Sequence, residues 1–501
     1  MKRSLLFGLA FLLTACLSPF GTTEELPAPY TPPTPVVDHE PTIFDIDITA
    51  PASAERMNDS RPNIILIVTD DQPYHTVDYM PFVKTELMQN GVVFENGFAT
   101  TPLCCPSRAS ILSGQYAHNH QVLTNTLPRG SASKFDASTS FSIQLQDSGY
   151  ETAYLGKYMN GYDDLTPRGV VPPGWDSWNV FLGKNLVNNE DAGNLQYYYN
   201  FTLSQNGEAV DYKRNDFNFS ADIITNMALA FIRDTKDTPF FMAVNYYNPH
   251  SPYICAPRHK DAFRASTNWD WVQYRPPSFN EENIRDKPEY IGDLSPLPEE
   301  KLDTAHLQIL RSLLSVDDGV ASIDAALKKA GLDENTIIIY TTDNGLTLGD
   351  HRFGVTKNCP YEACAKVPFI VYGPGYFEPR TDTSLVANID LYATIADWAG
   401  FQVPESVDGL DMAPLLEDPN APWRDALLIE HWPTDEGTGS SIPEFYAIRT
   451  QEWKYTEYVT GEVELYDLVN DPYEMQNMAG KKDYRTIQED LAKRLQELKE
   501  E

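Results

Sequence analysis

The feature that most constrains the fold is a set of short apolar runs, each followed at once by polar residues. The first run, Asn63–Thr69 (NIILIVT), is rich in β-branched residues and ends in Asp70 and Asp71. A continuous apolar run of this kind predicts a central strand that is buried on both faces of a parallel sheet. Open α/β sheets bind ligands beyond the carboxyl ends of their strands, so we expect a functional site at this end.

Three later runs repeat the arrangement. They cover residues 152–155, 240–246 and 336–342, and they are followed by Lys157, by His250 and by Asp343 and Asn344. Helical patterns lie between the strands, at 81–89, 141–148 and 302–329. The alternation predicts a doubly wound α/β sandwich with a central, mostly parallel sheet. Within the last helix, Asp317 and Asp318 are expected on a solvated face or at a cap.

The pattern of apolar and polar residues changes after about residue 418. The segments FYAIRT, WKYTEY and EVELYDL alternate as antiparallel strands do, and a charged helix is expected over 484–498. We therefore expect a main domain over 61–418 and a smaller α+β C-terminal subdomain with an antiparallel sheet over 419–501. The Pro- and Tyr-containing stretches at 167–200 and 257–297 are expected to be long ordered insertions over the site.

The N-terminus has the pattern of a targeting segment. Lys2 and Arg3 precede an apolar stretch over 5–13, and Cys16 follows small residues. The stretch is too short to span a bilayer and resembles a bacterial lipoprotein signal over 1–16, in which Cys16 would be lipidated. A plain secretory signal is the alternative. Residues 17–60 are Pro- and Thr-rich and read as an extended tether. Either signal predicts an extracytoplasmic protein, and lipidation would anchor it at the cell surface or in the periplasm.

The net charge of −34 argues against nucleic acid as a partner. It does not exclude an anionic substrate, because a local cationic pocket can outweigh the global field. Outside the cytoplasm disulfides are permitted, and Cys359 and Cys364 are close enough in sequence to pair. For Cys105 we expect packing or a disulfide, with Cys255 as a candidate partner.

The segment 104–114 (CCPSRASILSG) predicts a short helix. Pro106 suits a first turn, which places Cys104 and Cys105 just before the helix N-terminus, where free backbone N–H groups attract anions. Arg108, one turn further, can point at the same anion. A structural pair of buried or disulfide-bonded cysteines is the alternative for these residues alone.

The strand ends favour a reactive site over a structural one. Asp70, Asp71, Asp343 and Asn344 offer only oxygen ligands, which favour Ca²⁺ or Mg²⁺ over zinc. Such an ion beside a group of cationic side chains would bind a tetrahedral oxyanion and stabilise the charge that it gains in a transition state. The cations are Arg108, Lys157, His250 and Lys357.

The motif Cys104-Cys105-Pro106-Ser107-Arg108, with Leu-Ser-Gly at 112–114, is similar to the signature of the type I sulfatases. The later motifs follow in the family's order, ending in ELYDLVNDPYEMQNMA, and the resemblance covers residues 61–479. It implies an alkaline-phosphatase-like fold and oxidation of Cys104 to Cα-formylglycine (3-oxoalanine) by a maturation enzyme. The segments GKYMNGY, PPGWDSW, NPHSPY and LLSVDD resemble the branch of N-acetylglucosamine-6-sulfatases and extracellular heparan sulfatases, which implies 6-O-sulfated glucosamine of a glycosaminoglycan or related glycan as substrate.

The resemblance also implies a role for each site residue. Ca²⁺ would be bound by Asp70, Asp71, Asp343, Asn344 and the modified residue 104. The modified residue would attack sulfur, while Arg108, Lys157 and Lys357 hold the sulfate oxygens. His250 would protonate the leaving sugar oxygen.

Two departures from the family pattern stand out. Position 113 is Ser where Thr is usual, and position 160 is Asn where many sulfatases have the histidine that serves as base in the second step. We hypothesise that His118 or His120 replaces that base; sugar binding or helix capping are the alternatives. Asn160 and His351 are expected to contact substrate, and His75 either contacts substrate or lies on the surface.

Other functions stay open at this point. An arylsulfatase, or a phosphatase or phosphonate monoester hydrolase of the same superfamily, would use a similar site because phosphate and sulfate are both tetrahedral. A non-catalytic glycan-binding lipoprotein is a second alternative. A third keeps the fold but makes Cys104 an ordinary thiol nucleophile or a disulfide partner.

Overall fold

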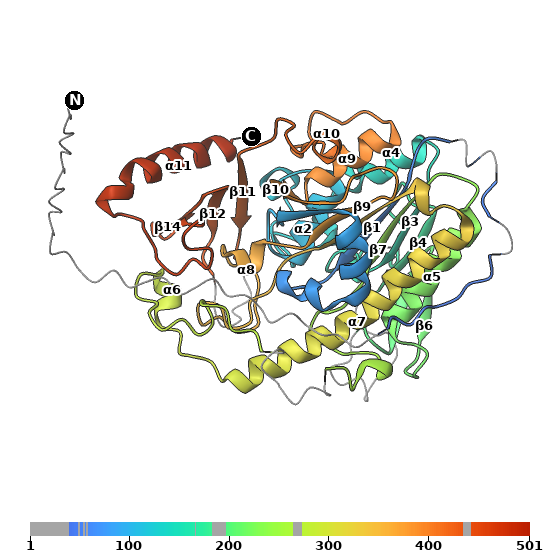
Figure 1. Cartoon of the computed structure of the whole chain (residues 1–501), viewed down its shortest axis with the longest axis horizontal. Helices are drawn as coiled ribbons and strands as arrows, with labels where there is room; N and C mark the ends of the chain where they lie inside the picture. Colours follow the sequence, from blue (N-terminus) through green and yellow to red (C-terminus); the bar gives the residue numbers. More distant parts are fainter. Residues whose placement is uncertain are drawn as a thin grey trace, which may run out of the picture.

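The computed structural model describes residues 40–500 except 49–50, 54–55, 57–58, 166, 183–196, 264–272 and 434–441. Its main sheet has ten strands in the order β10-β2-β9-β8-β1-β7-β3-β4-β5-β6 (Figure 1). The strands are β1 Asn63–Thr69, β2 Val92–Phe98, β3 Glu151–Gly156, β4 Ser177–Phe181, β5 Phe201–Gln205, β6 Glu208–Tyr212, β7 Phe240–Asn245, β8 Thr336–Thr342, β9 Phe369–Tyr372 and β10 Arg380–Ala387.

The centre of the sheet is parallel, as the apolar runs predicted. β1 lies between β7 and β8, with Ile65 opposite Met242 and Ile338, and β3 continues the parallel pairing beyond β7. Antiparallel pairs occur where β9 joins β2 and β8 and where β5 and β6 extend the far edge. The four strands expected from the sequence are thus confirmed, and their carboxyl ends lie at one edge.

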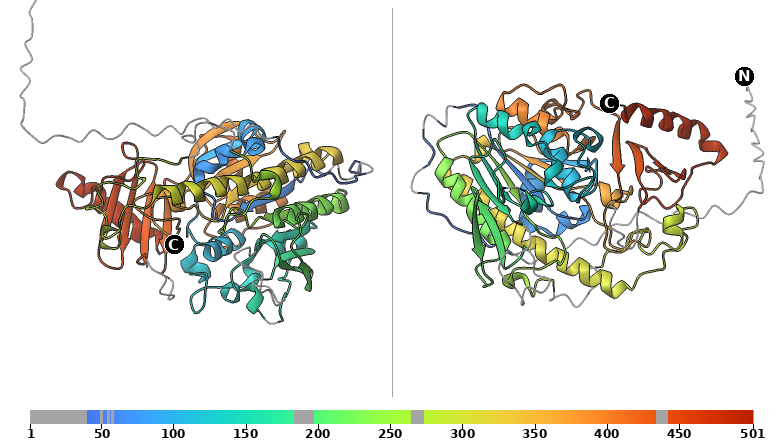
Figure 2. Two further views of the ribbon diagram at one scale, coloured as in Figure 1. Left: turned by 90° about the horizontal axis from the view of Figure 1, so that it is seen from below. Right: turned by 180° about the vertical axis from the view of Figure 1, so that it is seen from behind.

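Helices cover both faces of the sheet, so the doubly wound sandwich is confirmed (Figures 1 and 2). Ile65 and Ile67 of β1 pack into the core beneath α5 and α7, whereas Ile64 and Leu66 pack toward α2, α4 and α9. All four side chains are at most 1% exposed, which explains why the run is apolar at every position. The helices of these layers are α2 Cys104–Ser113, α4 Phe141–Asp147, α5 Ser220–Thr235, α7 Glu299–Ala330, α9 Asp390–Ala399 and α10 Ala413–Glu417.

The helix α2 begins two residues earlier than expected. Leu103 is its N-cap residue, so Cys104 and Cys105 lie inside the first turn with Pro106 rather than before it. The N–H of Cys105 donates to Oδ1 of Asn125 (2.8 Å), which satisfies one of the free donors of the helix end. The helix ends at Gly114, whose φ of 69° is in the left-handed region that favours glycine.

The long helix α7 is confirmed, but the expectation of a solvated face for its two aspartates is wrong. Asp317 and Asp318 are fully buried. Asp317 accepts hydrogen bonds from the N–H groups of Phe82 and Val83 (3.0 and 2.9 Å), at the start of the π-helix Val83–Met88. Asp318 pairs with Arg258 (2.6 Å). Both carboxylates therefore tie distant segments to α7, which a helical pattern alone does not reveal.

The C-terminal part contains a separate four-stranded antiparallel sheet, as expected. Its strands are β11 Ala426–His431, β12 Phe445–Thr450, β13 Trp453–Tyr458 and β14 Val463–Asp467, and α11 Arg485–Leu498 packs on it. Figure 1 shows the short helix α8 Glu362–Ala365 between the C-terminal sheet and the main sheet, and α6 Glu289–Gly292 below the C-terminal sheet. The domain boundaries at 61 and 418 stay predictions.

The cysteines divide into one disulfide and three free thiols among the described residues. Cys359 and Cys364 form the disulfide that their spacing allowed. Cys105 and Cys255 are both free, so the suggested bridge between them is wrong, and Cys105, in the first turn of α2, packs into the core. Cys16 and the signal lie outside the described residues. Within the described chain, no helix is long and apolar enough to cross a membrane.

Candidate active site

The ends of β1, β3, β7 and β8 bring the predicted polar residues together at one edge of the sheet. Asp70 and Asp71 follow β1, Lys157 follows β3 and Asp343 follows β8. The pairing of the sheet continues past the strands, since the N–H of Asp343 donates to the carbonyl oxygen of Thr69 (3.1 Å). The side chains are therefore held by a rigid backbone frame.

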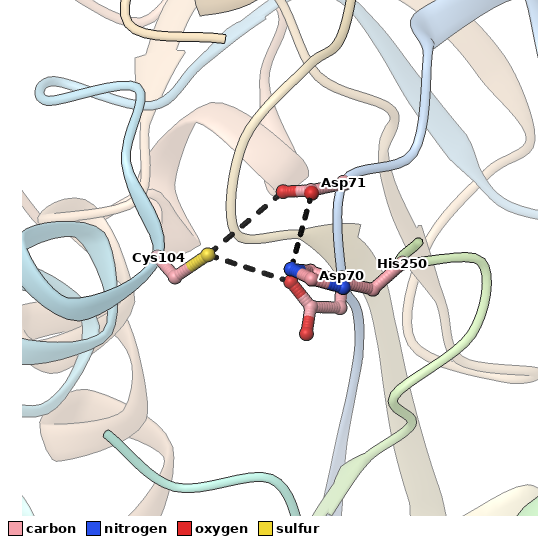
Figure 3. A group of neighbouring side chains, drawn as sticks. All are labelled: Asp70, Asp71, Cys104 and His250. Carbon is pink, nitrogen blue, oxygen red and sulfur yellow. Dashed lines mark hydrogen bonds and ion pairs between the residues drawn. The ribbon is translucent and has the colours of Figure 1, made fainter. Parts of the chain in front are cut away.

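Cys104, in the first turn of α2, lies among these groups. Its Sγ is 3.5 Å from Oδ1 of Asp70 and 3.8 Å from Oδ1 of Asp71, and Nζ of Lys357 donates to it (2.7 Å). Figure 3 shows Asp70, Asp71, Cys104 and His250 pointing toward one another. One potential ligand atom from each of these four residues lies within 4.8 Å of the others.

The thiol of Cys104 is not poised to act by itself. The residue is 1% exposed, and burial raises the pKa of Cys104 to about 12 although Lys157 and Lys357 oppose the shift. An unmodified Cys104 is therefore a neutral thiol at neutral pH, whereas the thiolate is the nucleophilic form. This argues against the alternative of an ordinary thiol nucleophile.

Both aspartates after β1 face cations. Lys157 pairs with Asp70, and Nζ of Lys357 is 2.5 Å from Oδ1 of Asp71. Nε2 of His250 is 3.5 Å from the other oxygen of Asp71. Burial opposes ionisation, but the nearby cations hold the pKa of Asp70 and the pKa of Asp71 below the usual range. The two buried carboxylates thus stay charged at neutral pH.

Arg108 and Asp343 form a fully buried ion pair, with 2.9 Å between Nε and Oδ2. Nη1 of Arg108 also donates to the carbonyl oxygen of Lys157 (2.8 Å) and to Oδ1 of Asn245 (3.0 Å). The guanidinium therefore links α2 to the ends of β3, β7 and β8. Its Nη2 has no hydrogen-bond partner in the described chain, which leaves one buried donor for a ligand. Asn245, the polar last residue of β7, was not among the predicted site residues.

Asn344 presents a buried oxygen that lacks a donor. Its Nδ2 donates to Oδ1 of Asp71 (2.8 Å), but its Oδ1 has no partner among the described residues. Leaving such an atom unsatisfied costs about 1–3 kcal/mol, so its presence indicates a ligand. The carboxylates of Asp70, Asp71 and Asp343 add further oxygens, and this donor set suits a hard divalent cation.

His250 is held by a tyrosine that the sequence analysis did not single out. The hydroxyl group of Tyr247 is 2.7 Å from Nδ1 of His250 and donates to the carbonyl oxygen of Ser251 (2.9 Å). The ammonium of Lys157 also lies over the ring of Tyr247, at 5.8 Å from its centroid. The position of Tyr247 three residues before His250, in the segment NYYNPH, was the signal in the sequence that could have identified this tyrosine.

A cavity of about 250 Å³ opens beside Lys157 and His250. Tyr197 and Tyr247 contribute ring surface to its wall, and Asn160 contributes an amide. Oδ1 of Asn160 is buried and has no partner in the described chain, although its backbone carbonyl accepts a hydrogen bond from Ala132 (2.7 Å). The cavity therefore offers an apolar wall and one free acceptor next to a cation and an imidazole.

The two histidines hypothesised as replacement bases are engaged elsewhere. Nδ1 of His118 is 2.9 Å from Oε2 of Glu430 in β11, and Nε2 of His120 is 3.0 Å from the hydroxyl oxygen of Ser110. Burial lowers the pKa of His120 to about 3. None of the hydrogen bonds within the described chain joins either imidazole to Cys104, so the geometry gives no support to the hypothesised base.

His351 and His75 line a different cavity from Asn160. That cavity has a volume of about 460 Å³ and lies between the main sheet and the C-terminal sheet. Nδ1 of His351 is 2.6 Å from Oε2 of Glu281, and the ring of His75 stacks on Tyr274 at 4.0 Å between centroids. The structure thus separates the two residues that were expected to contact substrate together, and it places His75 in a wall rather than on the open surface.

Comparison with known proteins assigns the family. A family profile described as "Sulfatase" matches residues 62–401, and one described as "N-sulphoglucosamine sulphohydrolase, C-terminal" matches 349–501. The chain belongs to the sulfatase family. It is therefore a sulfuric ester hydrolase, which removes the non-catalytic alternative.

This sulfatase is similar to two mammalian N-acetylglucosamine-6-sulfatases. It is 33% identical to the Capra hircus protein, over 85% of this chain and 83% of that protein. It is 34% identical to the Homo sapiens protein, over 85% of this chain and 84% of that protein. A solved structure in complex with its substrate D-glucosamine-2-N,6-O-disulfate is 26% identical, with a TM-score of 0.72 over 88% of this chain and 98% of that one. The alkaline-phosphatase-like architecture expected from the resemblance is confirmed.

Proposed function

We propose that this sulfatase removes the 6-O-sulfate from N-acetylglucosamine in a glycosaminoglycan or related glycan. The observation that carries the proposal is the convergence of Arg108, Lys157, His250 and Lys357 on Cys104 at the carboxyl edge of the sheet. The names of the relatives support the choice of sugar and of sulfate position.

A divalent cation, for which we propose Ca²⁺, fits the donor set of the site. Asp70, Asp71, Asp343 and Asn344 would hold it together with residue 104, and the unsatisfied Oδ1 of Asn344 is the observation that supports the fit. When bound, the ion supplies positive charge that acidifies an oxygen ligand and offsets the charge of a sulfate group.

The nucleophile is proposed to come from conversion of Cys104 to Cα-formylglycine by a maturation enzyme. In the unmodified protein described above, Sγ stands for the position that an oxygen of the hydrated aldehyde would take. That hydrate supplies a hydroxyl group for attack on sulfur and a second one for release of the enzyme. The neutral thiol of Cys104 supports the need for such a conversion.

The remaining side chains would bind the sulfate and move one proton. Nζ of Lys357 contacts Sγ of Cys104, and Nζ of Lys157 pairs with Asp70, which also contacts that sulfur, so both ammonium groups would donate to sulfate oxygens. Nη2 of Arg108 is an unused donor in the described chain. Nε2 of His250 faces the same point and would donate a proton to the leaving sugar oxygen. The sugar would occupy the cavity beside Lys157 and His250, with Asn160 accepting a hydrogen bond from it.

The cellular setting stays a proposal as well. Lipidation of Cys16 would tether the enzyme to a membrane outside the cytoplasm, where sulfated glycans and an extracytoplasmic disulfide are both expected. Membrane fractionation of wild type and of the Cys16→Ala variant tests it. Release of only the variant into the soluble fraction is expected, and equal solubility of the two would contradict it.

Matched esters test the reaction. We expect sulfate release from N-acetylglucosamine-6-sulfate to exceed that from the 3-sulfate isomer and from an aryl sulfate in kcat/KM. A matched 6-phosphate ester should be the poorer substrate. A clear preference for phosphate would overturn the proposed reaction in favour of a phosphatase or phosphonate monoester hydrolase, and a preference for the aryl ester would overturn the sugar.

A further inference from the structure

The larger cavity, of about 460 Å³, is not used by the proposed reaction. Its wall comes from segments that follow β1, β8 and β14, from the end of β12 and from α8, so it lies between the main sheet and the C-terminal sheet. Its volume is in the range of small-molecule sites, about 300–1,000 Å³. Tyr74 in its wall follows Asp71 of the active site by three residues, which limits the distance between their Cα atoms to about 11 Å. The cavity is thus a neighbour of the catalytic centre.

Aromatic rings form much of this wall. Tyr74, Tyr274, Tyr361 and Tyr473 line the cavity together with the two histidines described above. Such rings present rigid apolar faces with polar edges, a surface that suits the C–H face and hydroxyl groups of a sugar. The lining favours a carbohydrate over a purely apolar ligand.

Within the described part of the chain, charged groups of the wall other than Lys366 have close partners. Glu362 is 2.7 Å from Nζ of Lys454, and Glu474 is also 2.7 Å from it. Arg449 pairs with Glu362 (3.3 Å), and Asp350 accepts a hydrogen bond from Ser278 (2.8 Å).

Lys366 differs from these groups. It is half-buried and its ammonium lies 4.6 Å from the centroid of the Tyr74 ring. Among the described residues no carboxylate is within 4.0 Å of Nζ and no side-chain hydrogen bond is made by it. Burial lowers the pKa of Lys366, although the negative charges of Glu362 and Glu95 oppose the shift. An anion that binds beside an ammonium group in such surroundings forms a charge-assisted hydrogen bond with it and stabilises its charge.

We propose that the cavity around Lys366 is a second glycan subsite, which binds an acidic sugar unit of the same chain whose sulfate ester is being cleaved. The acidic group of that unit, a uronate carboxylate or a further sulfate, pairs with Lys366, and its ring packs on the tyrosines. The inference rests on the proposed function for its substrate class. It makes the enzyme prefer acidic oligosaccharides to the sulfated monosaccharide.

The test compares two substrates on the mature enzyme. One is N-acetylglucosamine-6-sulfate, and the other is a tetrasaccharide that carries the same 6-sulfated sugar next to uronate units. We expect Lys366→Met to lower the ratio of kcat/KM for the tetrasaccharide over that for the monosaccharide about tenfold, the value of one ion pair. Lys366→Arg should retain most of the ratio. Lys493→Met, at an exposed position of α11, is the matched control and should keep it unchanged.

Binding provides the second readout. Calorimetric titration with the desulfated tetrasaccharide and with its uronate-reduced, neutral form separates this proposal from the reaction itself. Tighter binding of the acidic form by wild type but not by Lys366→Met supports the subsite even if sulfate release fails. An unchanged kcat/KM ratio in Lys366→Met overturns the subsite, and so does equal binding of both tetrasaccharide forms by wild type. Equal activity losses on both substrates, together with a lower melting temperature, would also overturn it, because they would show only a loss of stability.

Discussion

The hydroxyl group of Tyr247 offers a sharp test of the role proposed for His250. It lies 2.7 Å from Nδ1, on the side of the imidazole away from Asp71. By fixing Nδ1, it directs Nε2 toward the reacting oxygen, which makes Tyr247 a positioning residue. A hydrogen bond to a charged group, here the imidazolium that donates the proton, is worth about 1.5–3 kcal/mol, and about 1.4 kcal/mol corresponds to a factor of ten in rate. We therefore expect Tyr247→Phe to lower kcat on N-acetylglucosamine-6-sulfate about tenfold or more.

The substrate decides whether this loss acts through the proton donor. A sugar alkoxide needs a proton to leave, whereas a nitrophenolate does not, so Tyr247→Phe should leave kcat on 4-nitrophenyl sulfate within about twofold of wild type. The ring that faces Lys157 remains in the variant. Tyr246→Phe is the matched control, because its buried hydroxyl group contacts Thr225 of α5 (2.8 Å) and not His250. Equal losses on the two esters would refute the reasoning.

Three further predictions concern the metal, the buried ion pair and one histidine. Asn344→Leu removes the unsatisfied oxygen and should weaken Ca²⁺ binding about tenfold or more in calorimetry, while chelation should abolish and added Ca²⁺ restore wild-type activity; unchanged affinity would exclude Asn344 as a ligand. Arg108→Gln leaves Asp343 buried without its partner and should lower the free energy of unfolding in urea by about 3–5 kcal/mol, with Arg108→Lys losing less; a loss below about 1 kcal/mol would contradict the pairing. Burial opposes protonation of His118, but the hydrogen bond with Glu430 raises the pKa of His118 above its usual value. The pair therefore stabilises the fold below about pH 6.5, and this stabilisation is lost as the pH rises through the raised pKa. His118→Gln should therefore cost about 1 kcal/mol at pH 5.5 and almost nothing at pH 9, and a cost that grows with pH would contradict this sign.

The sequence predicted the frame of the site because the frame follows from local patterns. The central strands β1 and β8 each carry a continuous apolar run and are buried at every position, so their burial on both faces could be predicted from the sequence. The end of a parallel strand then fixes the edge at which Asp70, Lys157 and Asp343 meet. The short helix at Cys104 followed from Pro106 and Gly114, with an error of two residues in its start.

What the sequence could not predict are partners that depend on the tertiary fold. The burial of Asp317 and Asp318 follows from segments far away in sequence, and a helical pattern cannot distinguish such residues from a solvated face. His118 lies near Cys104 in sequence, but its partner is Glu430 in the C-terminal sheet. The separation of Asn160 and His351 into two cavities depends in the same way on how the two sheets pack.

The measurement that tests the central claim most directly is sulfate release from N-acetylglucosamine-6-sulfate by the mature wild-type enzyme and by Cys104→Ala, with peptide mass spectrometry across residues 101–108 of the same samples. We predict one sulfate and one N-acetylglucosamine per substrate consumed by wild type, an aldehyde at position 104, and no turnover by the variant. Turnover by Cys104→Ala, or an active wild type whose residue 104 is entirely thiol, would contradict the account.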